Sequence, residues 1–232
     1  MDVPTRAFVD LHCHTSASFD SLAHPAAVAR AAAARGLTHL AITDHGTIDG
    51  ALRARDAAPS TLHVLVGEEI RTTAGDLIAV FLERAIPAGL SPSDAIAAVR
   101  EQGGLVGIPH PFDRRRGSLL ARAADGEVAG LVDWVEAYNA RVFGSTGNER
   151  AASFAHEHGL PGIAASDAHS TLEVAVAYTI LAGDASTPDG LRAALPGAEL
   201  VVGRASYVVR LFTPFAKAVH ALERRRERAR AR

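Results

Sequence analysis

The sequence is poor in cysteine, in aromatic residues and in net charge, and it has no long apolar run. One cysteine in 232 residues excludes an internal disulfide framework. A formal net charge of −2 argues against a protein that coats nucleic acid over its whole surface, although it is compatible with a local basic patch. No uncharged apolar run reaches the roughly 18 residues of a membrane span, and the N-terminus lacks the features of a signal peptide. We therefore expect a soluble, cytoplasmic protein without a membrane partner.

The residues that are abundant indicate a helix-rich α/β protein. Apolar residues make up 48% of the chain but aromatic residues only 5%, so the apolar share rests on alanine, valine and leucine. This composition is too apolar for a disordered chain and is typical of a soluble α/β domain. A length of 232 residues suits one large domain, or at most two small ones, with an ample core.

Strand-like segments alternate with alanine-rich helical segments along most of the chain. The helix expected at residues 25–35 begins with proline and is followed by Gly36, which are typical start and stop signals. Strands are expected at residues 8–11, 38–43, 62–69, 76–82, 105–109, 131–137, 162–165 and 178–182, and further helices at 48–57, 91–103, 145–158 and from 187 onward. This β-α repetition predicts a mainly parallel sheet covered by helices. About seven such units favour a barrel over an open sheet.

The C-terminal segment differs from the rest of the chain. We expect residues 1–213 to form the barrel and residues 214–232 to form an amphipathic, arginine-rich helical tail. The simpler interpretation of the charge run is a solvated, frayed helix end. Contact with nucleic acid or another acidic partner is the sharper hypothesis.

Two histidines at the end of the first strand form a candidate metal-binding pair. Side chains alternate along a strand, so His12 and His14 point to one side while Cys13 points elsewhere. Other candidate ligands follow later strands, in the segments Thr43-Asp44-His45, Gly67-Glu68-Glu69, Pro109-His110-Pro111 and Ser166-Asp167-Ala168-His169. Because the carboxyl ends of barrel strands meet at one rim, this pattern predicts a metal site there.

In order, these motifs resemble those of the PHP (polymerase and histidinol phosphatase) family, over roughly residues 7–182. The resemblance implies an α/β fold, a distorted (β/α)7-type TIM-like barrel that holds up to three divalent metals at the C-terminal rim of its strands. Members of the family include phosphomonoesterases, phosphodiesterases and the nuclease or accessory domains of bacterial DNA polymerases.

The resemblance also implies three sets of metal ligands. The first ion takes His12, His14, Glu69 and Asp167. Glu69 bridges to the second ion, which also takes His110. The third ion takes Asp20, His45 and His169.

Asp76 marks a departure from the family pattern, because many members have a histidine there as a further ligand of the second metal. As a ligand, Asp76 would make the site richer in oxygen, which favours Mn, Mg or Fe over Zn. The alternative is that Asp76 only begins a strand and that the second site is weakened. We expect two to three divalent ions in all, of Mn, Fe, Zn or Mg.

The expected chemistry follows from charge. Two cations that share a carboxylate can hold a water between them, lower its pKa and direct it at phosphorus, while they neutralise the phosphoryl oxygens. We therefore expect hydrolysis of phosphate esters by a metal-bridging hydroxide, with Glu69, Asp167 and His169 as catalytic residues. The substrate would be a phosphomonoester or phosphodiester of a small metabolite, a nucleotide or a nucleic-acid end.

Candidate substrate contacts follow two of the strands. Arg141 can reach the rim and suits phosphate, with a surface salt bridge as the alternative. Arg114 and Arg116 belong to a run of three arginines that cannot all point inward, so a surface position is the alternative for each. Asn139 can orient substrate or a metal-bound water, or merely cap its loop.

Two other functions compete with phosphoester hydrolysis. A non-catalytic or accessory metal-binding PHP module would be expected to have lost ligands, whereas here eight of the nine expected positions keep a ligand type common in the family and the ninth is Asp76. Metal-dependent hydrolysis of a non-phosphorus bond is the third hypothesis, and the arginine-bearing loops argue mildly against it. Nothing in the sequence selects an oligomeric state.

Overall fold

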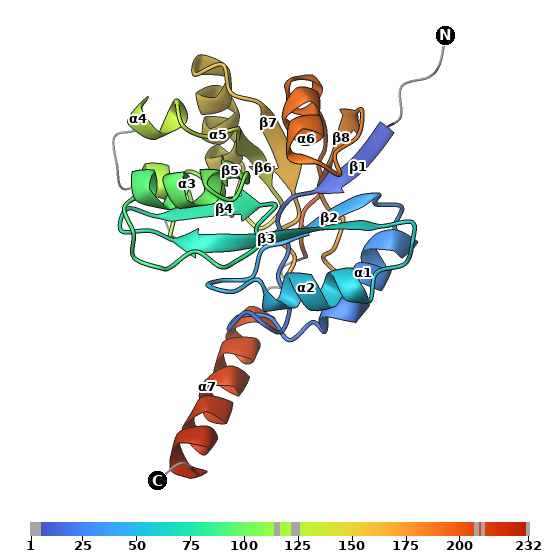
Figure 1. Ribbon diagram of the computed structural model, residues 1–232, viewed down its shortest axis with the longest axis vertical. Helices are drawn as coiled ribbons and strands as arrows, with labels where there is room; N and C mark the ends of the chain where they lie inside the picture. Colours follow the sequence, from blue (N-terminus) through green and yellow to red (C-terminus); the bar gives the residue numbers. More distant parts are fainter. Residues whose placement is uncertain (1–5, 114–116, 122–125, 207–208, 210–211, 231–232) are drawn as a thin grey trace.

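The computed structural model describes residues 6–113, 117–121, 126–206, 209 and 212–230. Its strands are β1 (Arg6–Asp10), β2 (His39–Ile42), β3 (His63–Arg71), β4 (Asp76–Val80), β5 (Leu105–Ile108), β6 (Trp134–Asn139), β7 (Gly162–Ala165), β8 (Tyr178–Ala182) and β9 (Glu199–Val201). Its helices are α1 (Pro25–Ala34), α2 (Asp49–Asp56), α3 (Pro92–Arg100), η1 (Leu119–Ala121), α4 (Gly126–Ala129), α5 (Thr146–Glu157), α6 (Pro188–Ala194), η2 (Leu195–Gly197) and α7 (Phe212–Arg230). The strands form one sheet in the order β7-β6-β5-β4-β3-β2-β1-β8-β9, which curves into a nearly closed barrel (Figure 1).

The barrel closes where β7 meets β1 and β8. Just beyond β1 and β7, Cys13 and Ala168 form a parallel bridge, and His14 N donates to Ala168 O at 2.8 Å. The Thr179 hydroxyl of β8 donates to the carbonyl of Ala164 in β7 and accepts from its amide, both at 2.9 Å. This closure brings the chain after β7 beside the chain after β1, so candidate ligands from both ends of the sequence share one rim.

The strand directions are more mixed than β-α repetition predicts. Four pairs are parallel (β1–β2, β2–β3, β5–β6 and β6–β7), and four are antiparallel (β3–β4, β4–β5, β1–β8 and β8–β9). The physical reason at β3–β4 is a tight turn, in which Thr72 N donates to Gly75 O at 3.0 Å. Antiparallel strands can be joined by such a turn, whereas parallel strands need a longer crossover. The expectation of a mainly parallel sheet is wrong, while the expected barrel is confirmed.

The two faces of the sheet pack against different partners. Alternate strand residues face outward and pack on the alanine-rich faces of α1, α2, α3 and α5, and Cys13 belongs to this outer core. The other residues form an inner core with α6, in which Trp134 is fully buried. Gly107 makes room for that indole, because a Cβ at Gly107 would lie 2.1 Å from it. Cys13 is therefore a core residue that points away from His12 and His14, as alternation predicts.

Helix α7 projects away from the barrel body, with the described C-terminal end far from it (Figure 1). Its first half is tied to the loop that follows β1: His220 Nε2 lies 2.9 Å from Ser21 O, and Lys217 Nζ lies 5.1 Å from the centre of the Phe19 ring. The helix agrees with the predicted tail, although it begins two residues earlier, and the division into two domains stays a prediction. Among the helices described, none combines the length and apolar character that crossing a bilayer would demand.

Candidate metal centre

His12 and His14 meet at the rim with their Nε2 atoms 3.0 Å apart. Each Nε2 lies 3.3 Å from Glu69 Oε2 and 3.7 Å from Asp167 Oδ1. Four tetrahedral donors about 2.1 Å from one ion would lie about 3.4 Å from one another. The spacing of these four side chains, which are the set expected for the first metal, therefore fits a divalent ion.

Glu69, near the end of β3, faces two sets of imidazoles with its two carboxylate oxygens. Oε1 lies 3.1 Å from His110 Nε2, while Oε2 faces His12, His14 and, at 3.4 Å, His45 Nε2. A carboxylate that presents one oxygen to each side has the geometry of a bridge between ions, as the resemblance implies for this residue.

Asp20 contacts both of the other ligands expected for the third ion. Its Oδ2 lies 3.1 Å from His169 Nε2 and 3.3 Å from His45 Nε2. In the described chain, four overlapping groups of histidines and carboxylates have ligand atoms within 4.8 Å of one another, and together they contain eight of the nine predicted ligands. These eight are His12, His14, Asp20, His45, Glu69, His110, Asp167 and His169.

Asp76 is the predicted ligand that stands outside these four groups. It is the first residue of β4, and the antiparallel direction of β4 brings it to the same rim as the end of β3. Its Oδ1 lies 2.5 Å from Nε of Arg71, a residue that the sequence did not single out. Burial, and then the nearby charge of Glu69, raise the pKa of Asp76 to about 6. Its role as a ligand stays a prediction.

The electrostatics of the rim favour a bound cation. Burial alone would lower the pKa of His12, but the carboxylates of Glu136 and Glu69 outweigh it and raise that pKa to about 10. Burial likewise opposes ionisation of Asp20, yet His169 and His45 hold its pKa far below the usual range. Burial lowers the pKa of His14 to about 4, so its imidazole is neutral and able to ligate. Carboxylates that stay ionised beside a neutral imidazole are a donor set for divalent ions.

Glu136 supports the centre from within β6 and was missed in the sequence. Its Oε1 accepts from His12 Nδ1 at 2.6 Å, and its Oε2 accepts from His110 N at 2.7 Å and from Asn139 Nδ2 at 2.9 Å. Because it lies in the middle of a buried strand rather than at its end, the rule that located the ligands passes over it. An acidic residue in an otherwise apolar strand is the signal that could have found it.

The predicted substrate residues lie in different settings. Asn139 is buried, and its Nδ2 also donates to Asp167 Oδ2 at 3.0 Å while its Oδ1 accepts from Arg141 N at 2.9 Å. These contacts favour positioning of the loop and of Asp167 over contact with substrate.

Arg141 reaches the rim cavity, where its guanidinium pairs with buried Glu173 and donates to Thr213 Oγ1 at 2.7 Å. Arg114 and Arg116 lie outside the described residues.

Two of the predicted ligands have a backbone conformation that is uncommon outside glycine. His110 has φ of 28° and Asp167 has φ of 51°. Such angles carry strain that persists only where the surrounding structure fixes them, and they cluster at functional sites. The strain here falls on two residues whose side chains face the centre.

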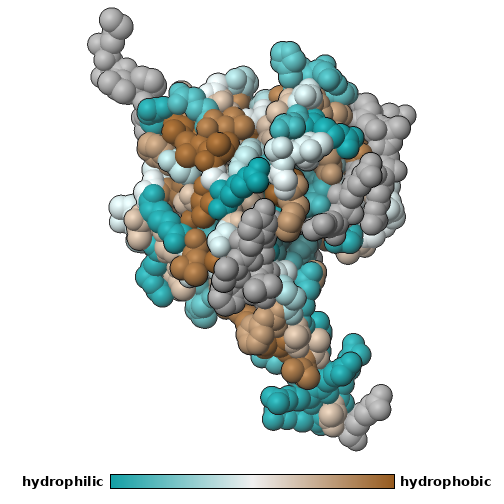
Figure 2. Space-filling model, turned by 180° about the vertical axis from the view of Figure 1, so that it is seen from behind, coloured by the Kyte–Doolittle hydropathy of each residue, from teal (hydrophilic) through white to brown (hydrophobic). Residues whose placement is uncertain are grey.

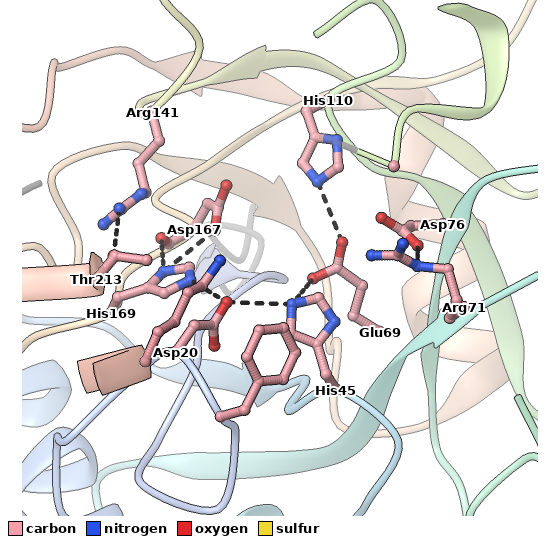
Figure 3. A pocket seen from close by; sticks show the side chains of 13 residues that line it. Asp20, His45, Glu69, Arg71, Asp76, His110, Arg141, Asp167, His169 and Thr213 are labelled. Atoms are coloured by element: carbon pink, nitrogen blue, oxygen red, sulfur yellow. Dashed lines mark hydrogen bonds and ion pairs between the residues drawn. The ribbon is translucent and has the colours of Figure 1, made fainter. Parts of the chain in front are cut away.

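The centre opens into a cavity of about 310 Å³ (Figure 3). Predicted ligands form its floor, and the lining also includes five residues that the sequence did not single out, among them Arg71, Phe19 and Lys217. The cavity is lined by Phe19, Asp20, His45, Glu69, Arg71, Asp76, His110, Gly117, Arg141, Asp167, His169, Thr213 and Lys217. Cationic groups beside a carboxylate-rich floor suit a substrate that carries negative charge into a metal site.

Parts of the sequence match known protein families and relatives. A sequence profile of the PHP domain matches residues 10–122, and a PHP-associated profile matches residues 145–198. An uncharacterized protein of Methanocaldococcus jannaschii, MJ1587, is 36% identical over 143 residues, which cover 56% of this chain and 81% of that protein.

Solved structures share the fold at low sequence identity. One is a two-domain protein from Bacteroides vulgatus, described as containing a predicted PHP-like metal-dependent phosphoesterase. Its TM-score is 0.71 at 20% sequence identity, and the match covers 88% of this chain and 66% of that protein. Another is endonuclease Q in complex with a 27-mer duplex substrate that has an abasic lesion at the active site. Its TM-score is 0.66 at 15% sequence identity, and the match covers 83% of this chain and 57% of that protein. This chain thus spans less than two thirds of either protein. With the matching profiles and the 36% identical relative, these comparisons establish that the chain belongs to the PHP domain family.

Proposed function

We propose that this protein hydrolyses phosphate esters with two to three divalent ions held at the rim of the barrel. The observation that carries the proposal is the position of Glu69, whose two oxygens face separate sets of imidazoles at the floor of an open cavity. Divalent ions bound there would activate a water and neutralise the charge that develops on the phosphoryl oxygens. Family membership and the metal-dependent phosphoesterase similarity support this reaction class.

The chain's own residues then have separate tasks. Glu69 would hold an ion with each of its two oxygens, while Asp167 and His169 face the cavity from the loop after β7 and are the further residues proposed to act on substrate. Asn139 holds the Asp167 carboxylate through Oδ2, which leaves the Oδ1 atom facing His12 and His14. Burial, and then the neighbouring His14 and Arg141, hold the pKa of His169 well below its usual range, so its ring stays neutral.

The cavity selects for a phosphorylated group. Arg71, Arg141 and Lys217 bring positive charge to its walls, and a guanidinium fork suits phosphate oxygens. Its volume of about 310 Å³ lies at the low end for ligand sites, which suits one small phosphorylated metabolite, a nucleotide or a nucleic-acid end. The endonuclease Q similarity supports keeping phosphodiesters beside phosphomonoesters in this class.

The test is hydrolysis of aryl phosphate mono- and diesters by purified protein loaded with Mn²⁺, with the metal content measured on the same sample. We expect activity that is lost in the double variant His12→Ala/His14→Ala. The matched control is His63→Ala, an exposed histidine at the start of β3, which should keep full activity. A metal-loaded protein that hydrolyses neither class of ester would contradict the proposal.

A further inference from the structure

Helix α7 concentrates the positive charge of the protein. It contains six basic residues against two acidic ones, Glu223 and Glu227, which gives it a formal charge of +4 within a chain of net charge −2. The remainder of the chain therefore carries −6. Hydrophilic side chains gather at the far end of this helix, beyond an apolar region near the body (Figure 2). In a protein whose remainder is acidic, this basic projection is a site for a polyanion.

The basic residues of α7 share a face with the residues that enter the metal cavity. At 3.6 residues per turn, Thr213, Lys217, Arg224 and Arg228 lie on one side of the helix, with Arg225 at its edge. Thr213 and Lys217 line the cavity of the metal centre. The cationic side is thus a continuation of the cavity wall along the helix.

The two acidic residues of α7 lie along one edge of this row. Glu223 and Glu227 share the side on which His220 reaches Ser21 O of the barrel, and Glu223 Oε2 lies 3.3 Å from His220 Nδ1. The contact to Ser21 fixes the rotation of the helix, with Glu223 and Glu227 along one edge of the row from Lys217 to Arg228 and Arg225 along its other edge.

The outer arginines form a hollow of their own. Ala221, Arg224, Arg225 and Arg228 line a second, shallow depression. From Lys217 to Arg228 the helix rises about 16 Å, a length that spans about five phosphates of one strand at helical spacing. The row therefore matches a charged polymer better than a single small anion.

These arginines have no acidic partner in the part of the chain that the structure describes. The ion pair recorded for this part of α7 joins His220 and Glu223 and involves none of Arg224, Arg225 or Arg228. Arg224 and Arg228 are also four residues apart, a spacing at which like charges destabilise a helix. Phosphates bound along this side would offset that repulsion through charge-assisted hydrogen bonds.

We propose that the basic side of α7 binds the backbone of a single-stranded nucleic acid and guides its end into the metal cavity. This proposal rests on the proposed phosphoester hydrolysis and names its substrate class. A single strand is favoured because a cavity of about 310 Å³ has room for a nucleotide but not for a duplex.

A second copy of the chain is the competing occupant. Phe215 and Leu222 are 60% and 55% exposed and share a third side of α7, which could pack against another helix. That apolar side does not reach the cavity, whereas the basic side does. The continuity with the metal centre favours nucleic acid.

The experiment measures binding and catalysis separately. A fluorescently labelled single-stranded oligonucleotide is titrated, without added metal, with wild-type protein, with Arg224→Ala/Arg225→Ala/Arg228→Ala and with a control. The control removes three exposed arginines of α1 and α2, as Arg30→Ala/Arg53→Ala/Arg55→Ala. The triple variant of α7, called the arm variant below, should bind at least about 10-fold more weakly. The magnitude of the slope of log K against log salt concentration, between about 50 and about 200 mM, should fall by about 2. The control should bind as the wild type does.

The same three proteins are then loaded with Mn²⁺ and assayed on an aryl phosphate ester and on the oligonucleotide. The arm variant should hydrolyse the small ester at the wild-type rate but show a raised KM for the oligonucleotide. Equal oligonucleotide binding by the arm variant and the wild type, with ester hydrolysis intact, would overturn the role of α7 alone. Binding that depends on the arm without hydrolysis of any ester would instead contradict the proposed function. A dimer in sedimentation that the arm substitutions dissociate, with unchanged oligonucleotide binding, would assign α7 to self-association and overturn the proposal.

Discussion

Glu136 accepts a hydrogen bond from Nδ1 of His12 at 2.6 Å, and both side chains are buried. With Nδ1 directed at Glu136, His12 turns Nε2 toward His14 and Glu69, where a bound divalent ion would replace the proton on that atom. Carboxylates that orient ligating histidines in this way fix the tautomer and raise the basicity of the ring. The contact links the middle of β6 to the segment that follows β1.

Replacing Glu136 by glutamine should weaken metal binding by about 10- to 100-fold, because the amide neither carries the charge nor fixes the His12 tautomer. Metal affinity is measured by competition with a chelator, and the fold is checked by thermal unfolding. Glu199→Gln, at an exposed site far from the rim, is the control. Unchanged affinity in Glu136→Gln would show that the hydrogen bond has no role in metal binding.

Glu69 and Glu68 form a matched pair for testing the bridge, because neighbours in a strand face opposite sides. Glu69 faces the imidazoles, whereas Glu68 Oε2 accepts from Ile86 N at 2.8 Å. We expect Glu69→Gln to lower hydrolysis of an aryl ester by at least about 100-fold and to reduce the metal content. Glu68→Gln should retain both the activity and the metal content. Equal loss in the two variants would indicate a general effect on folding instead of a bridging role.

Asp76 is tested by the count and identity of the bound ions. If its carboxylate is a ligand, Asp76→Ala loses an ion, while Asp76→His keeps the count and shifts the preference from Mn toward Zn, because imidazole suits the softer metal. Elemental analysis after loading from an equimolar mixture gives both quantities. Arg71→Ala, which removes the ion-pair partner at 2.5 Å, is the control and should leave the count unchanged. The same metal content in wild type and Asp76→Ala would assign Asp76 to the Arg71 pair alone.

The sequence predicted that most candidate ligands would lie together because they fall at or just beyond the ends of short apolar strands, and the rule that joins strand ends to a rim is geometric. It predicted the direction of β4 poorly, since hydrophobic pattern does not report whether a neighbouring strand runs parallel or antiparallel. Residues such as Glu136, Arg71 and Lys217 come to the centre through tertiary packing, and a single sequence carries no distance information for them. Asn139 was placed near the site, but its partners decide between positioning and substrate contact, and only the fold shows them.

The close approach of Gly107 and Trp134 gives a stability prediction that is independent of the metal. A Cβ at position 107 would lie 2.1 Å from the buried indole, so Gly107→Ala must displace a large side chain in the inner core. Overpacking of this kind costs about 1–3 kcal/mol in the free energy of unfolding, measured by urea denaturation. Gly130→Ala is the control, because nothing lies within 4 Å of its added Cβ. A Gly107→Ala variant as stable as the wild type would show that the indole can move at no cost.

His39 gives a pH dependence that originates far from the metal centre, at the start of β2. Burial, and then the charge of neighbouring His63, lower the pKa of His39 below its ordinary value of 6.5, while Asp184 at 3.9 Å opposes the shift. The unfolded chain therefore binds a proton at this residue more readily than the folded chain does. The stability that His39 contributes is present above pH 6.5 and is lost as the pH falls through the lowered pKa.

Between about pH 7.5 and about pH 5.5, the free energy of unfolding of the wild type should consequently fall more steeply than that of His39→Gln, which cannot take up this proton. Urea denaturation at a series of pH values measures both slopes. His156→Gln, on the exposed side of α5, is the control and should follow the wild-type slope. Parallel curves for His39→Gln and the wild type would show that His39 titrates alike in the folded and unfolded chains. The acid sensitivity of the fold would then have to come from the buried carboxylates at the rim.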